Sequence, residues 1–257
     1  GRKIERPFRR LHYAEAVEKY GSDKPDLRVP LEMRDLTAVG RDGSSEVLKA
    51  VVAGGGEVKG LLIPGAGTLS RGQLDKLSEK AKALGAKGLI WIKQQEEWKS
   101  SLKTAEADYE RIWAVLGGVN SDLALLVADK KGTALKVLGE IRRTWPVEDV
   151  ARRDSLEFCW VTDFPLFEWS DEEKRFVSMH HPFTSPHEED LILLETEPGR
   201  VRAKAYDLVL NGTEVGGGSI RIHDMDIQRR IFKALGLTDK ETEEKFGYFL
   251  EALGYGA

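Results

Sequence analysis

The stretch AYDLVLNGTEVGGGSIRIH, residues 205–223, indicates most clearly how part of this chain folds. Runs with strand-like alternation flank Asn211 and Gly212. Both residues tolerate a positive φ, so the pair favours a two-residue hairpin turn. We therefore predict two antiparallel strands, residues 204–210 and 214–223, joined at this turn.

Two acidic residues of the predicted hairpin share one face. In an ideal register Val209 pairs with Glu214, and Asp207 pairs with Gly216. Directly opposed residues share a face and side chains alternate, so the carboxylates of Asp207 and Glu214 lie about one diagonal apart. Two close carboxylates suit a shared divalent cation, and their hard oxygen ligands suit Mg²⁺. The glycines at 216–218 leave room for a ligand, although a solvent-facing hairpin with scattered charges is the alternative.

Arg221 lies seven residues after Glu214 in the same predicted strand. That odd separation places the two side chains on opposite faces of a regular strand. If Arg221 serves the same site as Glu214, the glycine run must contain a bulge or a break. A bulge in this strand is therefore a testable structural prediction.

Two adjacent histidines, His180 and His181, stand in the run MHHPFTSP. Adjacent strand residues point to opposite faces, so both could bind one metal ion only with distortion. The other histidines, His12, His187 and His223, show no ligand spacing for zinc. We expect instead a histidine that donates a hydrogen bond to an anionic ligand. A histidine packed at a strand end is the structural alternative.

The segments around the hairpin indicate a mostly antiparallel sheet backed by helices. Residues 157–162 and 175–179 have strand patterns, and residues 224–235 and 241–253 have helical patterns. Near the N-terminus, residues 12–20 have the pattern of a short helix.

The middle of the chain, residues 31–145, has the pattern of a self-contained α+β domain. Ser70 and Gln73 form a capping box that begins a helix. The other expected elements are strands at 47–53, 58–63, 88–93 and 123–129, and helices at 104–116 and 130–145.

Two further features have plain structural explanations. Residues 65–70 (GAGTLS) follow a strand and precede a helix, like a dinucleotide-binding fingerprint. Ser70 stands where the fingerprint has glycine, and the next strand ends in Lys93 instead of an acid, so a tight turn with an N-cap explains the run. A dehydrogenase is therefore a distant alternative. Cys159 lies in an apolar strand pattern and is expected to be a buried structural thiol.

Composition favours a globular protein of the cytoplasm. Of the 257 residues 41% are hydrophobic, and 39 basic against 43 acidic side chains give a net charge of −4, so any RNA contact must come from local patches. A single cysteine excludes a disulfide framework and favours a reducing setting. The longest apolar runs, such as 123–128, are far shorter than the roughly 20 residues that span a bilayer, so we expect no membrane partner. Both ends of the sequence look cut.

Several long motifs carry a family resemblance. In chain order they are 6–8 (RPF), 13–16 (YAEA), 20–28 (YGSDKPDLR), 161–168 (VTDFPLFE), 180–186 (HHPFTSP), 207–223 and 245–256 (KFGYFLEALGYG). Together they resemble the part of bacterial-type aspartyl-tRNA synthetases that lies between motif 2 and motif 3, over essentially the whole chain. The resemblance is loosest from about residue 34 to residue 145, which corresponds to the insertion domain of that family, also called the GAD domain.

This resemblance implies an α+β fold: a partial class II synthetase antiparallel sheet with helices, interrupted by the α+β GAD domain. The implied boundaries are 1–30 for the catalytic segment after motif 2, 31–145 for the insertion domain, and 146–257 for the catalytic segment up to motif 3. It also implies L-aspartate, ATP and tRNA as substrates, Mg²⁺ as a cofactor, and a homodimer in the complete enzyme.

The resemblance also assigns roles to single residues. His180 corresponds to a histidine that binds the substrate aspartate, with His181 beside it. Arg221 corresponds to the arginine that holds the aspartate side-chain carboxylate, a role that suits the bidentate guanidinium fork. Glu214 corresponds to a glutamate linked to ATP and magnesium, and Asp207 to its acidic partner on the neighbouring strand.

Parts of the family pattern are missing from these 257 residues. The anticodon-binding barrel and the arginines of motifs 2 and 3, which hold ATP, are not among them. We therefore predict negligible catalytic activity from this chain alone. One rival interpretation is a non-catalytic RNA- or protein-binding module centred on the insertion domain. Another is an amide- or adenylate-forming enzyme that works without tRNA, against which the segment 21–28 (GSDKPDLR) argues.

Overall fold

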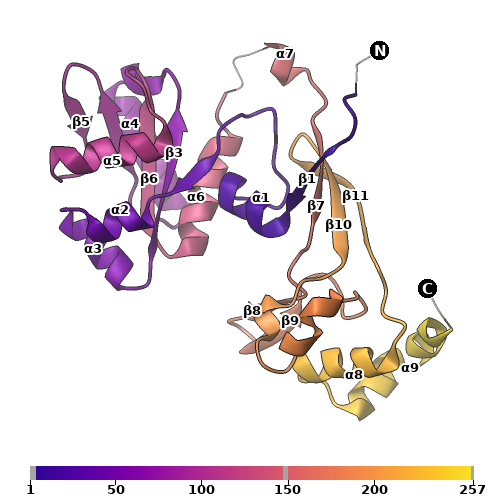
Figure 1. The fold of residues 1–257 in the computed structure, drawn as a ribbon. Coiled ribbons are helices and arrows are strands. Elements are labelled where there is room, and N and C mark those ends of the chain that lie inside the picture. The colour runs from indigo at the N-terminus through magenta and orange to yellow at the C-terminus, as the bar shows by residue number, and fades with distance from the viewer. Residues whose placement is uncertain (1–3, 147–149, 256–257) are drawn as a thin grey trace. The chain divides into compact units, whose positions relative to one another are not determined.

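The chain forms two compact units in the computed structural model, which describes residues 4–146 and 150–255 (Figure 1). The first unit is formed mainly by Glu15–Glu157, and the second by Glu5–Ala14 together with Phe158–Ala257. Each unit has a sheet of its own with helices around it. The predicted α+β class with antiparallel sheets is confirmed.

The first unit is built on a five-stranded sheet of order β2-β3-β6-β4-β5, in which every neighbouring pair is antiparallel. The central strand reads LALLVAD, and its first five residues are buried. Such a continuous apolar run is typical of a strand covered on both faces. The strands are β2 (Met33–Asp35), β3 (Glu57–Ile63), β4 (Ile90–Gln94), β5 (Trp98–Ser100) and β6 (Leu123–Asp129).

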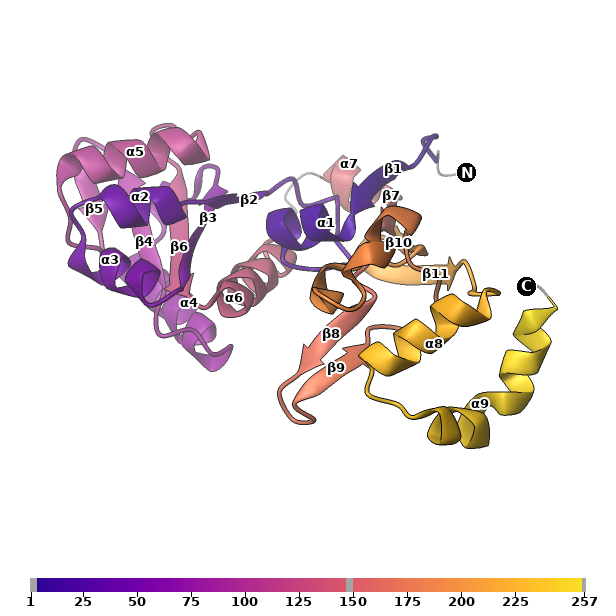
Figure 2. The ribbon, with the colours of Figure 1, turned by 60° about the horizontal axis from the view of Figure 1, so that its bottom comes forward.

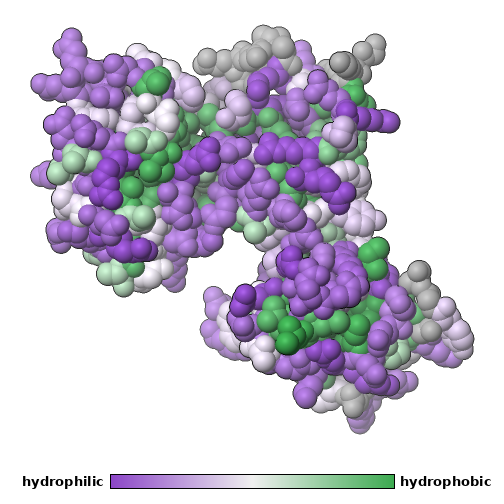
Figure 3. All heavy atoms as spheres, viewed as in Figure 1, coloured by the Kyte–Doolittle hydropathy of each residue, from purple (hydrophilic) through white to green (hydrophobic). Residues whose placement is uncertain are grey.

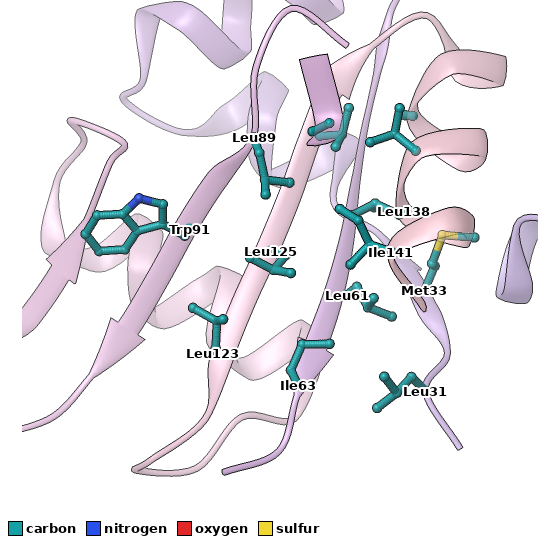
Figure 4. Packing of buried hydrophobic residues seen from close by; sticks show 14 of the residues in the cluster. Leu31, Met33, Leu61, Ile63, Leu89, Trp91, Leu123, Leu125, Leu138 and Ile141 are labelled. Atoms are coloured by element: carbon teal, nitrogen blue, oxygen red, sulfur yellow. The ribbon is translucent and has the colours of Figure 1, made fainter. Parts of the chain in front are cut away.

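Helices cover both faces of this sheet (Figure 2). The helices are α2 (Thr37–Asp42), α3 (Glu46–Ala53), α4 (Arg71–Ala83), α5 (Glu106–Leu116) and α6 (Lys131–Arg143). Leu125 of β6 packs with Leu138 in the core under α4 and α6 (Figure 4). Its neighbour Leu126 packs with Leu48 and Ile112 in a second core under α2, α3 and α5. Successive residues of one strand therefore stabilise two separate helical layers.

One strand predicted for this unit is wrong, because residues 47–53 belong to helix α3. Ser45 Oγ accepts the backbone N–H of Leu48 and begins the helix, and Glu46 stands in the first turn. Val47 is 63% exposed, so the apolar run does not form a buried strand. The other strands and helices predicted for this unit are confirmed, including the capping box of Ser70 and Gln73.

Lys59 of β3 is a buried charge in the first unit. Its side chain is 2% exposed, and Nζ lies 2.9 Å from Glu18, 3.1 Å from Asp35 and 2.8 Å from Glu57. Burial would raise the pKa of Glu18, but hydrogen bonds from Lys131 and Lys59 lower it below its ordinary value. The pKa of Asp35 is lowered against the same effect of burial by hydrogen bonds from Thr37 and Lys59. The lysine therefore holds a cluster of ionised carboxylates together.

The second unit contains a four-stranded sheet of order β1-β7-β10-β11. Its strands are β1 (Arg9–His12), β7 (Phe158–Thr162), β10 (Ala205–Leu210) and β11 (Thr213–Ser219). β1 runs parallel to β7, and the other pairs are antiparallel. A separate two-stranded ribbon joins β8 (Phe167–Ser170) to β9 (Arg175–Ser178). The strands predicted at 157–162, 175–179 and 204–210 are confirmed, the strand predicted at 214–223 ends at Ser219, and β1 and β8 were not predicted.

Helices of the second unit follow the hairpin directly. α8 (Met225–Ala234) begins at Asp224, whose side chain accepts two backbone N–H groups, and α9 (Asp239–Gly254) begins with a capping box. The predicted N-terminal helix is α1 (Tyr13–Tyr20), which belongs mostly to the first unit, and α7 (Val150–Arg153) is a single turn of that unit. In the surface view of Figure 3, a hydrophobic patch lies near β8 and β9. Among the described residues, no helix is long and apolar enough to span a membrane.

Candidate functional site

The hairpin of β10 and β11 turns where the sequence predicts. Leu210 pairs with Thr213, and the φ angles of Asn211 and Gly212 are 52° and 82°. The predicted pairing of Val209 with Glu214 is also confirmed.

A β-bulge follows within this hairpin. Leu208 pairs with Gly216, so Val215 is an extra residue without an opposing partner. The predicted pairing of Asp207 with Gly216 is therefore wrong by one residue, and Asp207 pairs with Gly217. The bulge that the sequence required for Arg221 exists, immediately before the glycine run.

Asp207 and Glu214 meet at Gly217. A Cβ on Gly217 would collide with Asp207 Oδ1 and would lie 3.3 Å from Glu214 Oε1. Asp207 is 5% exposed, whereas Glu214 lies at the surface. Only glycine at this position lets both carboxylates approach the same point.

Arg221 lies just beyond the end of β11, and its side chain contacts Ser219, which the bulge places on the same face of the hairpin as these acids. Ser219 pairs with Ala205, two residues from Asp207, and Arg221 follows Ser219 by two more. Arg221 Nη1 contacts Ser219 Oγ and His181 Nε2. Within the part of the chain that the structure describes, no carboxylate pairs with Arg221.

The two histidines of the HHPF run have different surroundings. His181 Nδ1 accepts the backbone N–H of Phe183 at 3.2 Å. Burial lowers the pKa of His181, and the charges of Arg221 and then His180 lower it further, so the neutral ring is favoured. His180 is exposed, and its ring packs edge-on against Phe164 with centroids 4.9 Å apart. The structure thus brings His181, and not His180, into contact with Arg221.

The contact between Arg221 and His181 sets a guanidinium, which can only donate, against a ring nitrogen whose role depends on the tautomer. Arg221 keeps further N–H groups, and their planar fork matches an anion with two oxygens, such as a carboxylate.

Sequence reasoning missed Ser219, Thr184 and Gln228 in this region. Thr184 is 1% exposed and its Oγ1 donates to Ser219 Oγ at 3.3 Å. Gln228 is 1% exposed and its Nε2 donates to Pro182 O at 2.8 Å. Serine, threonine and glutamine occur at many kinds of position, so no sequence motif marks these three residues. Their contacts appear only in the folded structure, where distant segments lie together.

Two further groups of the sequence analysis lie outside this site. Residues 65–70 form a tight turn with the predicted N-cap, and Gly65 has a φ of 69°. Cys159 is fully buried, and burial raises the pKa of its thiol to about 11, as expected for a structural cysteine.

Asp163, with a φ of 59°, accepts a hydrogen bond from Thr162 Oγ1 at 2.7 Å and lies 2.8 Å from His187 Nε2.

The metal-binding potential of the chain is limited to small groups. Among the described residues, no cluster of three or more His, Cys, Asp or Glu side chains is arranged to hold a metal ion. Mg²⁺ usually keeps several waters and is bound by one or two carboxylates together with substrate phosphates. The pair Asp207 and Glu214 matches this mode of binding, in which two carboxylates act together with substrate phosphates.

Residues 2–257 match the family of class II tRNA synthetases (D, K and N), and the chain belongs to that family.

Its curated relatives carry more specific names. The aspartate–tRNA(Asp/Asn) ligase of Caldanaerobacter subterraneus subsp. tengcongensis is 48% identical over 260 residues, and that of Heliobacterium modesticaldum is 48% identical over 265. The aspartate–tRNA ligase of Clostridium botulinum strain Eklund 17B is 46% identical over 261 residues. The matches cover 98 to 100% of this chain but 43 to 44% of each relative, so the chain spans less than half of their length.

Proposed function

We propose that this chain is part of an aspartate–tRNA ligase and forms one side of its amino-acid and ATP site. The whole protein would activate L-aspartate with ATP and transfer it to the 3′ end of tRNA. Two observations support this proposal: Arg221 contacts His181, and Asp207 and Glu214 both lie next to Gly217 of the same hairpin.

Arg221 and His181 would bind the side-chain carboxylate of aspartate. The guanidinium lacks a carboxylate partner among the described residues, and its planar fork of donors matches the two oxygens of a carboxylate. Asparagine would place an amide N–H₂ against one of these donors, so the pair would reject it. His180, exposed beside this pair, would contact the bound aspartate from the solvent side.

Asp207 and Glu214 would hold Mg²⁺, with Glu214 also serving ATP. When bound, the cation would supply positive charge to the phosphates of ATP. A carboxylate oxygen of aspartate would attack the α-phosphorus, and the bond from that phosphorus to the bridging oxygen would break, releasing pyrophosphate and leaving aspartyl-adenylate. This chain would contribute by binding and orienting the reactants.

The remaining assignments concern the whole protein. We propose that residues 1–30 and 146–257 belong to a catalytic domain and residues 31–145 to a GAD insertion domain, in a homodimeric enzyme of the cytoplasm. Because its relatives are more than twice as long, the isolated chain is expected to have negligible activity. The alternative is a non-catalytic module, centred on residues 31–145, that contacts RNA or protein. Deleting residues 31–145 from the whole enzyme and measuring tRNA affinity tests that role.

A chimaera tests the proposed activity. The 257 residues replace the matching segment of the Clostridium botulinum relative, and aspartate-dependent exchange of radiolabelled pyrophosphate into ATP is measured. We expect exchange with aspartate and not with asparagine. Arg221→Ala should abolish it, whereas Arg229→Ala, which removes an exposed arginine paired with Asp226, should not. A well-folded chimaera without exchange would contradict the proposal.

A further inference from the structure

A cavity of about 240 Å³ lies in the first unit, between the loop that follows α1 and the last turns of α6. Two glycines hold these segments together. Gly21 has a φ of 71°, and a Cβ on Gly139 would lie 2.8 Å from Gly21 Cα. Because neither position has room for a side chain, the loop lies directly on the helix and the cavity is a fixed part of the fold. The polar residues that line it include Ser22, Lys24, Lys136 and Arg142.

Arg142, in the last turn of α6, is a buried cation. Its side chain is 1% exposed, and its guanidinium lies 4.7 Å from the centre of the Tyr20 ring. Burial lowers the pKa of Arg142 to about 10, so the side chain keeps its charge at neutral pH. Among the described residues, no carboxylate forms an ion pair with it. Since buried charges are normally paired, an anion is the partner that this guanidinium lacks.

One nitrogen of Arg142 is left for such an anion. Nε donates to Leu31 O at 2.6 Å, and Nη2 donates to the carbonyl oxygens of Asp26 and Val29. Nη1 has no hydrogen-bond partner in the part of the chain that the structure describes, and it is not sealed from solvent. Because three carbonyl oxygens fix the plane of the guanidinium, the two N–H groups of Nη1 are donors of fixed direction, as suits the recognition of an anion.

The other charged residues around the cavity leave an excess of positive charge. Of the described residues that line it, the acids are already paired: Asp26 lies 2.6 Å from Arg28, and Glu140 lies 2.8 Å from Arg143. Lys136 is exposed on α6 and has no ion pair or hydrogen bond with any described residue. An anion in the cavity would therefore be bound by the ammonium of Lys136 as well as by Arg142.

We propose that this cavity is a phosphate site, formed by Arg142 and Lys136, that binds a backbone phosphate of RNA. The volume suits one phosphate group, and its oxygens match the N–H groups of Nη1. The exposed position of Lys136 allows the bound phosphate to remain part of a longer strand. The choice of RNA rests on the proposed function, whereas the affinity for phosphate does not.

The first experiment titrates the 257-residue chain with inorganic phosphate and follows the Nε–H group of Arg142 by ¹⁵N NMR, with chloride at equal ionic strength as the reference. Phosphate should shift this resonance to saturation, and chloride should not. Lys136→Ala should weaken phosphate binding about threefold to tenfold, because one charged contact is lost. Lys76→Ala, which removes an exposed lysine of α4 outside the cavity, should leave the affinity unchanged. A resonance that phosphate moves no more than chloride does would overturn the proposal.

The second experiment measures the affinity of a tRNA transcript and of an unrelated RNA hairpin for the same variants over a range of salt concentrations. Each phosphate contact adds roughly 0.7–0.9 to the slope of log affinity against log salt concentration. Lys136→Ala should therefore lower this slope by about that amount for both RNAs, and Lys76→Ala should not. Both RNAs should also displace inorganic phosphate from Arg142, and thermal unfolding shows whether each variant is folded.

Two outcomes would overturn the assignment to an RNA backbone. One is an unchanged salt slope in a folded Lys136→Ala chain, and the other is bound phosphate that RNA does not displace. Absence of pyrophosphate exchange in the wild-type chimaera, with the phosphate and RNA results as expected, would instead count against the proposed function.

Discussion

Replacing Gly217 by alanine tests whether Asp207 and Glu214 act as one cation site. The new Cβ would collide with Asp207 Oδ1 and lie 3.3 Å from Glu214 Oε1, whereas a Cβ on Gly216 would meet nothing within 4 Å. Neither glycine has a positive φ, so alanine causes no backbone strain at either position. Gly216→Ala is therefore a matched control that differs only in the side-chain contact.

The expected size of the effect follows from the burial of Asp207. Because this side chain is 5% exposed, its carboxylate can move only against its packed surroundings. Overpacking of this kind costs about 1–3 kcal/mol. If a cation needs both carboxylates in their present places, that free energy is lost from binding, and the affinity falls roughly 5-fold to 150-fold. Gly216→Ala should change the affinity by about twofold at most.

Mn²⁺ is the probe for this test, because its free form is counted directly by electron paramagnetic resonance. The 257-residue chain is titrated in the presence of ATP, and Mg²⁺ is then added as a competitor. Asp207→Asn serves as a positive control, and thermal unfolding shows whether each variant is folded. Equal Mn²⁺ affinity for the two alanine variants would refute a site shared by Asp207 and Glu214.

Three further predictions concern charge and backbone. Because the pKa of His181 is lowered in the folded chain, the unfolded chain takes up a proton first as the pH falls below about 6.5. The unfolding free energy should therefore decline as the pH falls through this range. Bound L-aspartate should raise the pKa of His181 in a histidine NMR titration. Lys59→Met should lower the unfolding free energy of the first unit by about 1–3 kcal/mol in urea denaturation, since Asp35 and Glu57 lose the lysine and Glu18 keeps only Lys131. The loss should shrink as the pH falls below 3.8, the ordinary pKa of Asp35, because the lowered pKa values of Glu18 and Asp35 keep them ionised down to that range. Asn211→Ala should destabilise the hairpin by about 1 kcal/mol because φ is 52°, and Asn211→Gly should not; thermal unfolding measures both.

Local signals allowed most of the fold to be predicted. The turn at Asn211 and Gly212 and the capping box at Ser70 and Gln73 depend on the conformations that a few neighbouring residues permit, and the structure contains both. The prediction of a strand at 47–53 is wrong because valine and leucine are compatible with either a buried strand or one side of a helix. There the decision came from the N-cap and from the exposure of Val47, and exposure is a tertiary property.

The site was less accessible to sequence reasoning than the fold. The shared face of Asp207 and Glu214 followed from strand alternation, but the register beyond Leu208 required the bulge, whose position no residue type marks. The contact between His181 and Arg221 joins segments that are far apart in the chain, and alternation within one strand says nothing about it. The roles assigned to these residues therefore stay predictions, and the structure shows two separate pairs, Arg221 with His181 and Asp207 with Glu214.

The extra residue at position 215 makes β11 sensitive to length in a way that is independent of chemistry. Val215 is 51% exposed, so many side chains could replace it at little cost. Its removal would straighten the strand and turn Ser219 and Arg221 to the reverse of the sheet, away from His181, although every ligand-binding group would still be present. The strand therefore needs a residue at position 215, but the type of residue there matters little.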